Sequence, residues 1–148
     1  MPIFSLSVFY AFRTLGHLRG PGEGWVRVEI LSERTAAPGP FLAKVLQALQ
    51  KAGVVDSLRG RNGGFRLRVA PTGLPLAAIV DALDGTGWRH ACLLGVGTCT
   101  GRAGCPAEAC CRDLRDKLVA ELERLTVADL GPILAAAPLQ EAAVQMGA

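Results

Sequence analysis

The chain has 148 residues, of which 50% are hydrophobic and 20% are charged. That length predicts a single domain with a substantial core, and the composition excludes an intrinsically disordered chain. No apolar run approaches the roughly 20 residues of a membrane-spanning helix. The apolar start lacks the basic segment of a signal peptide, so we expect a cytoplasmic protein with reduced thiols. The net charge of +3 permits a nucleic-acid partner without requiring one.

The first 53 residues predict three helices. Apolar residues recur at helical spacing over 4–18, and the glycines and proline of 19–24 end that helix. A short second helix is expected before Pro38, after a strand-like start in which Val26, Val28 and Ile30 alternate. Proline suits the first turn of a helix, so Gly39-Pro40 opens the third one. Its apolar face is Phe41, Leu42, Val45, Leu46 and Leu49, and Gly53 is placed to end it.

The second and third helices form a helix-turn-helix pattern, and an arginine-rich hairpin follows them. Residues 54–69 have two β-rich arms around Asn62-Gly63, a strong hairpin signal. Guanidinium groups at the tip of such a wing can contact phosphates or enter a minor groove, and polar side chains on the third helix can reach the major groove. The residues predicted to contact double-stranded DNA are Lys44, Gln47, Arg59 and Arg61.

Three more helices are expected after the hairpin. They are a short one over 74–83, a long one over 106–125, and a last one over 127–136 that the hydroxyl of Thr126 is expected to cap. Leucines repeat at helical spacing along the long helix. Such a stripe is typical of either an intramolecular core or a dimer seam. The leucines are Leu114, Leu118, Leu122 and Leu125.

A glycine-rich loop holds the chemistry-bearing residues. All five cysteines of the chain lie in or just after it, at Cys92, Cys99, Cys105, Cys110 and Cys111. Ordering so many glycines costs entropy, and a metal centre bound by several thiolates would offset that cost. Gaps of six and five residues between the first three cysteines are longer than zinc sites usually have. They favour an iron–sulfur cluster, which is larger than one ion and is held mainly by thiolates.

With the wing and the cysteine loop both described, the chain resembles the Rrf-two family of bacterial transcription regulators. The resemblance covers about residues 6–134. The motifs that carry it are Tyr10-Ala-Phe-Arg-Thr-Leu15, Phe41-Leu-Ala-Lys-Val-Leu46, Lys51-Ala-Gly-Val-Val55, Ser57-Leu-Arg-Gly60, Gly63-Gly-Phe65, Ile79-Val-Asp-Ala82, Leu125-Thr-Val-Ala-Asp-Leu130 and the three cysteines Cys92, Cys99 and Cys105.

The resemblance implies a winged-helix homodimer that binds a pseudo-palindromic operator, with the long helix crossing between subunits. It also implies a 2Fe-2S or 4Fe-4S cluster on the three cysteines that senses cluster supply, nitric oxide or redox state. The family includes the regulator of iron–sulfur cluster assembly, nitric-oxide-sensing repressors and cysteine-synthesis repressors that hold no cluster.

Three positions depart from the pattern of the family. Phe9 stands where nitric-oxide sensors of the family have a ligating aspartate, and Ala43 stands where the assembly regulator often has a base-reading glutamate. The fourth ligand of that regulator is a histidine three residues after the third cysteine, and here this position is Glu108. Glu108 is our sequence-based choice for the fourth ligand. The alternatives are Cys110, Cys111, His90 and a residue of the other subunit.

The sequence thus predicts a mainly α protein with a small β-hairpin, in one compact domain. Its parts are a winged-helix DNA-binding region over 1–85, a cluster-binding loop over 86–105, and a dimerisation helix with a C-terminal tail over 106–148. The leading hypothesis is a regulator whose operator affinity is controlled by a cluster. The first alternative is a cluster-free thiol switch. A small thiol or metal enzyme is the remote alternative, because the sequence has neither a Cys-x-x-Cys motif nor a phosphate-binding glycine loop, so we predict that the chain is not an enzyme.

Overall fold

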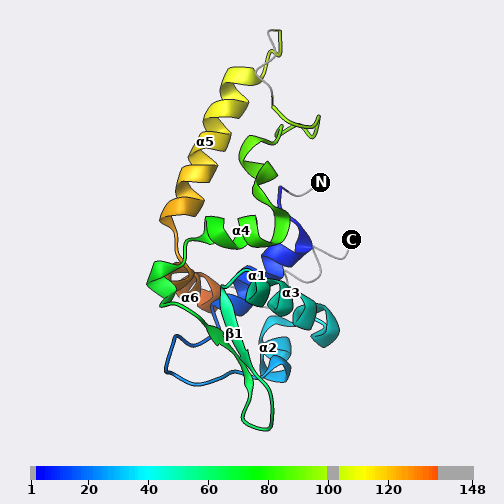
Figure 1. Cartoon of the computed structure of the whole chain (residues 1–148). Helices are drawn as coiled ribbons and strands as arrows, with labels where there is room; N and C mark the ends of the chain where they lie inside the picture. The colour runs from blue at the N-terminus through cyan, green and yellow to red at the C-terminus, as the bar shows by residue number, and fades with distance from the viewer. Residues whose placement is uncertain (1–2, 100–103, 137–148) are drawn as a thin grey trace.

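The computed structural model describes residues 3–99 and 104–136. The helices and strands follow one another along the chain as the sequence predicts (Figure 1). They are α1 (Leu6–Leu15), α2 (Val28–Thr35), α3 (Gly39–Lys51), β1 (Val55–Leu58), β2 (Gly64–Leu67), the 3-10 turn η1 (Pro71–Gly73), α4 (Leu76–Asp84), the 3-10 turn η2 (Thr86–His90), α5 (Glu108–Arg124) and α6 (Val127–Ala136). The part of the predicted third region after residue 136 lies outside the described residues.

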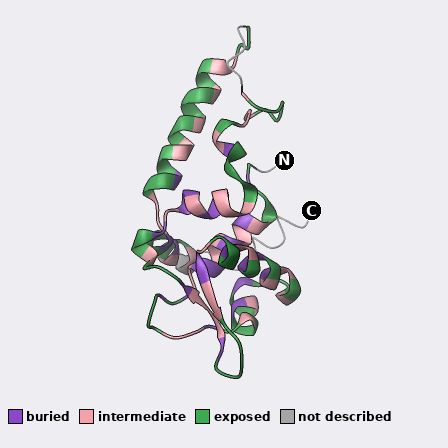
Figure 2. Ribbon diagram, viewed as in Figure 1, coloured by how far each residue is buried: buried purple, intermediate pink, exposed green. Residues whose placement is uncertain are grey.

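The core lies where α1, α3 and α4 pack together, with α2, the hairpin and α6 around them. Figure 2 shows buried residues gathered in this body, whereas most of α5 is exposed. The core is built mainly from aliphatic side chains, and Trp88 of η2 is a large aromatic that joins it at 7% exposure. The largest fully buried apolar side chains are Leu15, Leu31, Leu42, Leu46, Leu49, Leu67, Ile79, Val8, Val55 and Val80.

Two helix termini are capped, one of them as the sequence predicts. Gly53 takes φ +80° directly after α3, and its N–H donates to the carbonyl of Gln50 at 3.0 Å. This is the glycine-terminated helix end that the sequence predicts. At the start of α1, the hydroxyl of Ser5 accepts the N–H of Val8, and the N–H of Ser5 donates to Asp84 Oδ2 at 2.7 Å. The N-terminus of α1 is thereby tied to the end of α4.

The strand-like start predicted before the second helix is confirmed only at Val26. Val26 forms an antiparallel bridge with Phe65, in which the two residues exchange N–H···O bonds of 2.9 and 2.8 Å. From Val28 onward the chain is α2, and not a strand. The bridge extends the two-stranded hairpin by one pair, so the wing is attached to the segment that leads into α2.

The hairpin forms as predicted, but its turn is not an Asn-Gly turn of two residues. β1 and β2 pair from Val55↔Leu67 to Leu58↔Gly64, which leaves five residues in the loop. Gly63 N–H donates to Gly60 O at 3.1 Å, so the central residues of the turn are Arg61 and Asn62. At Gly63, a Cβ would lie 2.0 Å from the carbonyl oxygen of Leu58. This close approach of the two arms explains the glycine and displaces the turn by one residue.

The last two helices also have the predicted positions. Thr126 does not cap α6 through its hydroxyl as acceptor: its hydroxyl and its N–H both donate to Asp129 Oδ2, at 3.1 and 2.8 Å. The capping acceptor is therefore the carboxylate three residues into the segment, the reciprocal half of a capping box. No helix in the described part of the chain is long and apolar enough to cross a membrane.

The leucine stripe of α5 divides along its length. Leu122 is 8% exposed and belongs to the core of its own chain, and Leu118 is half-buried against that core. Leu114, one turn farther from the body, is 53% exposed. The lower end of the stripe is thus intramolecular core, and the upper end carries a large apolar side chain that this chain does not cover.

Candidate DNA-binding face and cysteine site

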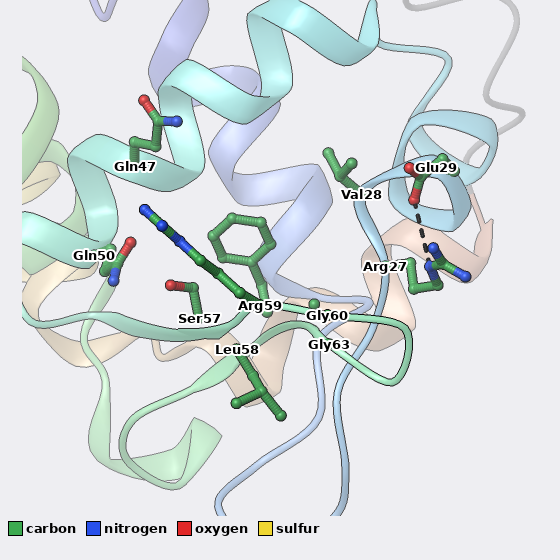
Figure 3. Close-up of a pocket in the computed structure, with 12 residues that line it drawn as sticks. Arg27, Val28, Glu29, Gln47, Gln50, Ser57, Leu58, Arg59, Gly60 and Gly63 are labelled. Atoms are coloured by element: carbon green, nitrogen blue, oxygen red, sulfur yellow. Dashed lines mark ion pairs between the residues drawn. The ribbon is translucent and has the colours of Figure 1, made fainter.

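A hollow of about 310 Å³ separates α3 from the wing. Gln47 on α3 and Arg59 at the end of β1 lie on opposite sides of it, and Figure 3 shows the Arg59 side chain extending across the hollow toward Gln47 and Gln50. The structure therefore brings together two of the four residues predicted to contact DNA. The lining residues are Arg27, Val28, Glu29, Gln47, Gln50, Ser57, Leu58, Arg59, Gly60, Gly63, Gly64 and Phe65.

The other two predicted contacts lie beside this hollow and do not line it. Lys44 is exposed on α3, one turn before Gln47. Arg61 is exposed at the centre of the wing's turn. Both remain on the surface that α3 and the wing present to solvent.

Four lining residues with polar side chains were not predicted from the sequence to contact DNA: Arg27, Glu29, Gln50 and Ser57. Gln50 is three residues after Gln47, and that helical spacing could have placed it on the same face. Arg27 reaches the hollow because Val26 pairs with Phe65, a contact between distant segments that no local pattern shows. Figure 3 shows Arg27 paired with Glu29, at 3.8 Å between Nε and Oε2.

The four arginines of the hairpin divide into two pairs. Arg68 forms an ion pair of 2.9 Å with Asp56 across the two strands, and Arg66 lies 4.2 Å from the ring centroid of Trp25. Among the described residues, Arg59 and Arg61 have no ion-pair partner. Their charges are thus available to an anionic ligand, whereas the other two stabilise the wing.

The described part of the cysteine loop is closed by backbone hydrogen bonds. Cys92 N–H donates to Gly97 O at 2.8 Å, and Cys99 N–H donates to His90 O at 2.9 Å. A bridge between Ala91 and Thr98 joins these two bonds. Cys92 and Cys99 are half-buried, and Cys105 is exposed just before α5. Residues 100–103, between the second and third cysteines, lie outside the described residues.

The Cys92 sulfur lies beside several backbone N–H groups of the loop. Backbone N–H groups of Val96, Leu94 and Gly95 donate to it and hold the pKa of this thiol below its ordinary value, although partial burial opposes the shift. Metal ligands must be deprotonated, and thiolates bound to clusters accept hydrogen bonds of this kind. The arrangement therefore stabilises a thiolate at position 92.

The candidates for a fourth ligand have different surroundings. Cys110 is exposed on α5, and Cys111 is half-buried. Glu108, at the start of α5, lies 3.6 Å from Arg112 in an ion pair between Oε1 and Nη1. His90 is exposed at the end of η2, where it lines a cavity together with Arg89, Arg115 and Glu123.

The donor set has the chemistry of an iron–sulfur site. In residues 3–99 and 104–136, no three Cys, His, Asp or Glu side chains stand close enough to hold one metal ion. A cluster spans several atoms and is held by more widely spaced thiolates than a single ion. Five free thiols around one loop, with a thiolate stabilised at Cys92, therefore fit a cluster better than an isolated ion.

A helix pair followed by a hairpin wing, with an exposed polar face on the second helix of the pair, defines a winged helix-turn-helix protein. The family model Rrf2, described as an iron-dependent transcriptional regulator, matches residues 4–132. The chain belongs to the Rrf2 family.

Curated relatives agree with this family. A putative HTH-type transcriptional regulator of Aquifex aeolicus is 37% identical over 92 residues, which are 62% of this chain and 64% of the relative. The HTH-type transcriptional regulator IscR of Escherichia coli is 31% identical over 107 residues, 72% of this chain and 65% of the relative. The matched segments thus span less than two thirds of the length of these relatives. The family and these relatives are transcriptional regulators and not enzymes, as predicted.

Solved structures confirm the fold. CymR of Bacillus subtilis, titled a global cysteine regulator, superposes with a TM-score of 0.70 at 21% identity, over 90% of this chain and 98% of CymR. The structure of T. potens IscR gives a TM-score of 0.65 at 22% identity, over 97% of this chain and 95% of that one. At such identities the likeness concerns the fold alone.

Proposed function

We propose that this chain is a DNA-binding transcriptional regulator whose operator affinity is controlled by an iron–sulfur cluster. The observation that carries the DNA-binding part is the hollow shared by Gln47 of α3 and Arg59 of the wing. The proposed regulator acts as a homodimer on a double-stranded operator in the cytoplasm. The proposed cluster, 2Fe-2S or 4Fe-4S, is held by Cys92, Cys99 and Cys105, and Glu108 is the fourth ligand predicted from the sequence.

The DNA-binding face combines a helix that fits a groove with charges that fit a backbone. Lys44, Gln47 and Gln50 follow one another at intervals of three residues and are all exposed on α3. A major groove about 12 Å wide admits such a helix, and a glutamine there pairs with adenine. Arg59 and Arg61 extend the positive surface along the wing, where phosphates or a minor groove would lie.

Replacing Arg59 by alanine is expected to weaken operator binding by about 1–3 kcal/mol, because a guanidinium that displaces phosphate counterions is lost. If the contact is to phosphate, the salt dependence flattens by about one unit of slope. The measurement is titration, at several salt concentrations, of a duplex selected from a random library by the wild-type protein. Arg124→Ala is the control, since Arg124 pairs with Glu121 on α5 at 2.7 Å. Wild-type affinity in both Arg59→Ala and Gln47→Ala would contradict the proposed docking.

The cluster-binding part of the proposal is supported by the chemistry of the cysteine loop. When bound, a cluster supplies a centre that gains or loses electrons and whose assembly reflects the supply of iron and sulfide. The chain's own residues connect this loop to the body. His90 holds Cys99 through its carbonyl, and the adjacent Arg89 bonds both Asp81 of α4 and Glu123 of α5. The conformation of the cysteine loop is therefore linked, through His90 and Arg89, to the contact between α4 and α5.

The regulatory step is a population shift between two settings of the DNA-binding face. A coupling free energy of about 1–3 kcal/mol changes operator affinity about 5–150-fold. We expect protein purified without oxygen to contain iron and sulfide and to absorb visible light, and its operator affinity to change by such a factor on removal of the cluster. Equal affinities of the two forms would contradict cluster control while leaving DNA binding intact.

A thiol switch without a cluster is the second candidate. It is favoured by the lowered pKa of Cys92 in a half-exposed loop, since low-pKa accessible thiols are the ones that oxidants reach. The two candidates differ in one measurement. A cluster gives visible absorption that disappears with the iron, whereas a thiol switch gives colourless protein whose operator affinity changes on treatment with peroxide and is restored by a thiol reductant.

A further inference from the structure

The hollow between α3 and the wing has a third side, formed by the segment that leads into α2. Arg27 and Glu29 line the hollow there, and Figure 3 shows them on the side away from Gln47. The bridge between Val26 and Phe65 holds this segment against the wing through backbone bonds of 2.9 and 2.8 Å. The place of Arg27 beside the wing is therefore fixed by the backbone and does not depend on its own side chain.

The side chain of Arg27 has little part in the fold. Arg27 directly precedes α2, where its backbone is extended and its side chain makes no capping hydrogen bond. In the described part of the chain its ion-pair partner is Glu29, with 3.8 Å between Nε and Oε2, and the two side chains are 56% and 70% exposed. This distance is longer than that of an N–H···O hydrogen bond, and an ion pair so exposed contributes little to stability.

The charges around the hollow are two arginines and one carboxylate. They belong to Arg27, Arg59 and Glu29, and none of the other described residues that line the hollow is charged. In the free protein Glu29 offsets the charge of Arg27, so the charge without a partner is that of Arg59. A phosphate offers a guanidinium two short charge-assisted hydrogen bonds, which are stronger than one contact of 3.8 Å. A DNA backbone brought to the hollow would therefore compete with Glu29 for Arg27.

We propose that Arg27 is a further contact to the DNA backbone, and that operator binding exchanges its ion pair with Glu29 for one with a phosphate. This inference rests on the proposed DNA binding and is independent of the proposed cluster. Arg27 holds the backbone from the α2 side of the hollow, and Arg59 holds it from the wing. Because phosphates carry no sequence information, Arg27 positions the duplex and does not read it. Glu29, which loses its partner beside the phosphates, lowers the affinity.

The first test is Arg27→Ala, titrated against the duplex selected by wild-type protein at several salt concentrations. Binding is expected to weaken about three- to tenfold, because a charge-assisted bond to phosphate is lost. The salt dependence flattens by about one unit of slope, and operators with altered bases are weakened by the same factor. Arg124→Ala is the matched control, because Arg124 is also ion-paired but lies on α5. Thermal unfolding of Arg27→Ala is expected to match that of wild type.

The second test is Glu29→Gln, alone and combined with Arg27→Ala. The single variant is expected to bind the operator about two- to threefold more tightly, since no exposed ion pair has to be broken and no carboxylate remains beside the phosphates. In the Arg27→Ala background the gain is expected to be smaller, because there is no pair left to release. This double-mutant cycle measures the exchange of partners directly.

Four results would overturn the inference. Wild-type affinity and salt slope in Arg27→Ala would remove the contact, and a loss confined to operators with particular base pairs would make it a base contact. Equal gains from Glu29→Gln with and without Arg27 would exclude the exchange of partners. If Arg59→Ala weakens binding and Arg27→Ala does not, the proposed docking stands and this inference alone fails. A wild-type protein that selects no duplex would overturn the proposed DNA binding, and this inference with it.

Discussion

Cys92→Ala is expected to abolish the binding of iron and sulfide completely, whereas Cys110→Ala keeps both at the wild-type level. Cys92 is the cysteine whose thiolate the loop stabilises with three backbone N–H groups. Without its sulfur, those N–H groups have no acceptor there, and the loop loses a ligand whose thiolate form they stabilise. Iron and sulfide analysis with visible absorption after anaerobic reconstitution is the measurement.

The effect on DNA distinguishes a lost ligand from a damaged fold. We expect Cys92→Ala to bind the operator with the affinity of wild-type protein stripped of its cluster. Cys92 does not line the hollow between α3 and the wing, so its loss leaves the DNA-binding face intact. Cys105→Ala should behave in the same way, although its thiol is more exposed. Retention of a full cluster in either variant would remove that cysteine from the ligand set.

Leu114→Asp is expected to convert a homodimer into a monomer that keeps its fold and loses only the stability that association adds. Leu114 is 53% exposed on α5, so its side chain contributes little to the core of its own chain. A second copy covering the upper part of this helix would bury it, and a carboxylate at that place would be desolvated without a partner. Light scattering gives the mass, and a monomeric wild type would contradict the dimer outright.

Leu118 and Leu122 serve as comparisons for that variant. Leu118→Asp is expected to dissociate the dimer and also to lower stability, because Leu118 is half-buried against the core. Leu122→Ala is expected to cost about 2–5 kcal/mol of folding free energy, as for other buried leucines. A denaturation series on the three variants thus separates the intermolecular part of the stripe from the intramolecular part.

The elements of the fold follow from local chemistry, so they could be predicted. Apolar residues of α3 recur at helical spacing, and Gly53 ends the helix because it takes a left-handed conformation. The Asn62-Gly63 motif alone places the turn one residue too late, because its position depends on the approach of Gly63 to Leu58 and also on a contact beyond the hairpin. Gly64 takes φ +148° where a Cβ would lie 2.4 Å from the carbonyl of Val26. That contact joins segments almost 40 residues apart, which no short motif encodes.

The candidate site was predictable in kind and not in detail. The residue types of the wing and the crowding of cysteines indicated DNA and a cluster. The burial of the leucines along α5 could not be read from their spacing, because Leu114 and Leu118 share one side of the helix and differ in exposure through their distance from the body. Arg27 lines the hollow beside α3 because Val26 pairs with Phe65. The family motifs do not include Arg27.

Arg89 bonds one end of α5 to α4, and the other end of this long helix lies beside the cysteine loop (Figure 1). The helix has 17 residues, a length of about 25 Å at 1.5 Å per residue. Figure 1 shows its far end beside the cysteine loop and its near end at α4, with the wing at the opposite end of the molecule. Arg89 joins the near end to α4, because it donates hydrogen bonds to both Glu123 and Asp81.

A tilt of α5 about this joined end would move the opposite end of the helix farthest. Under the proposed cluster control, a change at the cysteine loop would reach α4 through the bonds of Arg89 to Glu123 and Asp81. The adjoining helix α4 is tied to the start of α1 through Asp84 and Ser5. A close-packed core has low compressibility, so a displacement of α4 would pass on to the helices packed against it. The length of α5 thus sets how far the cysteine loop lies from the DNA-binding body, and the bonds of Arg89 are a point at which the two are joined.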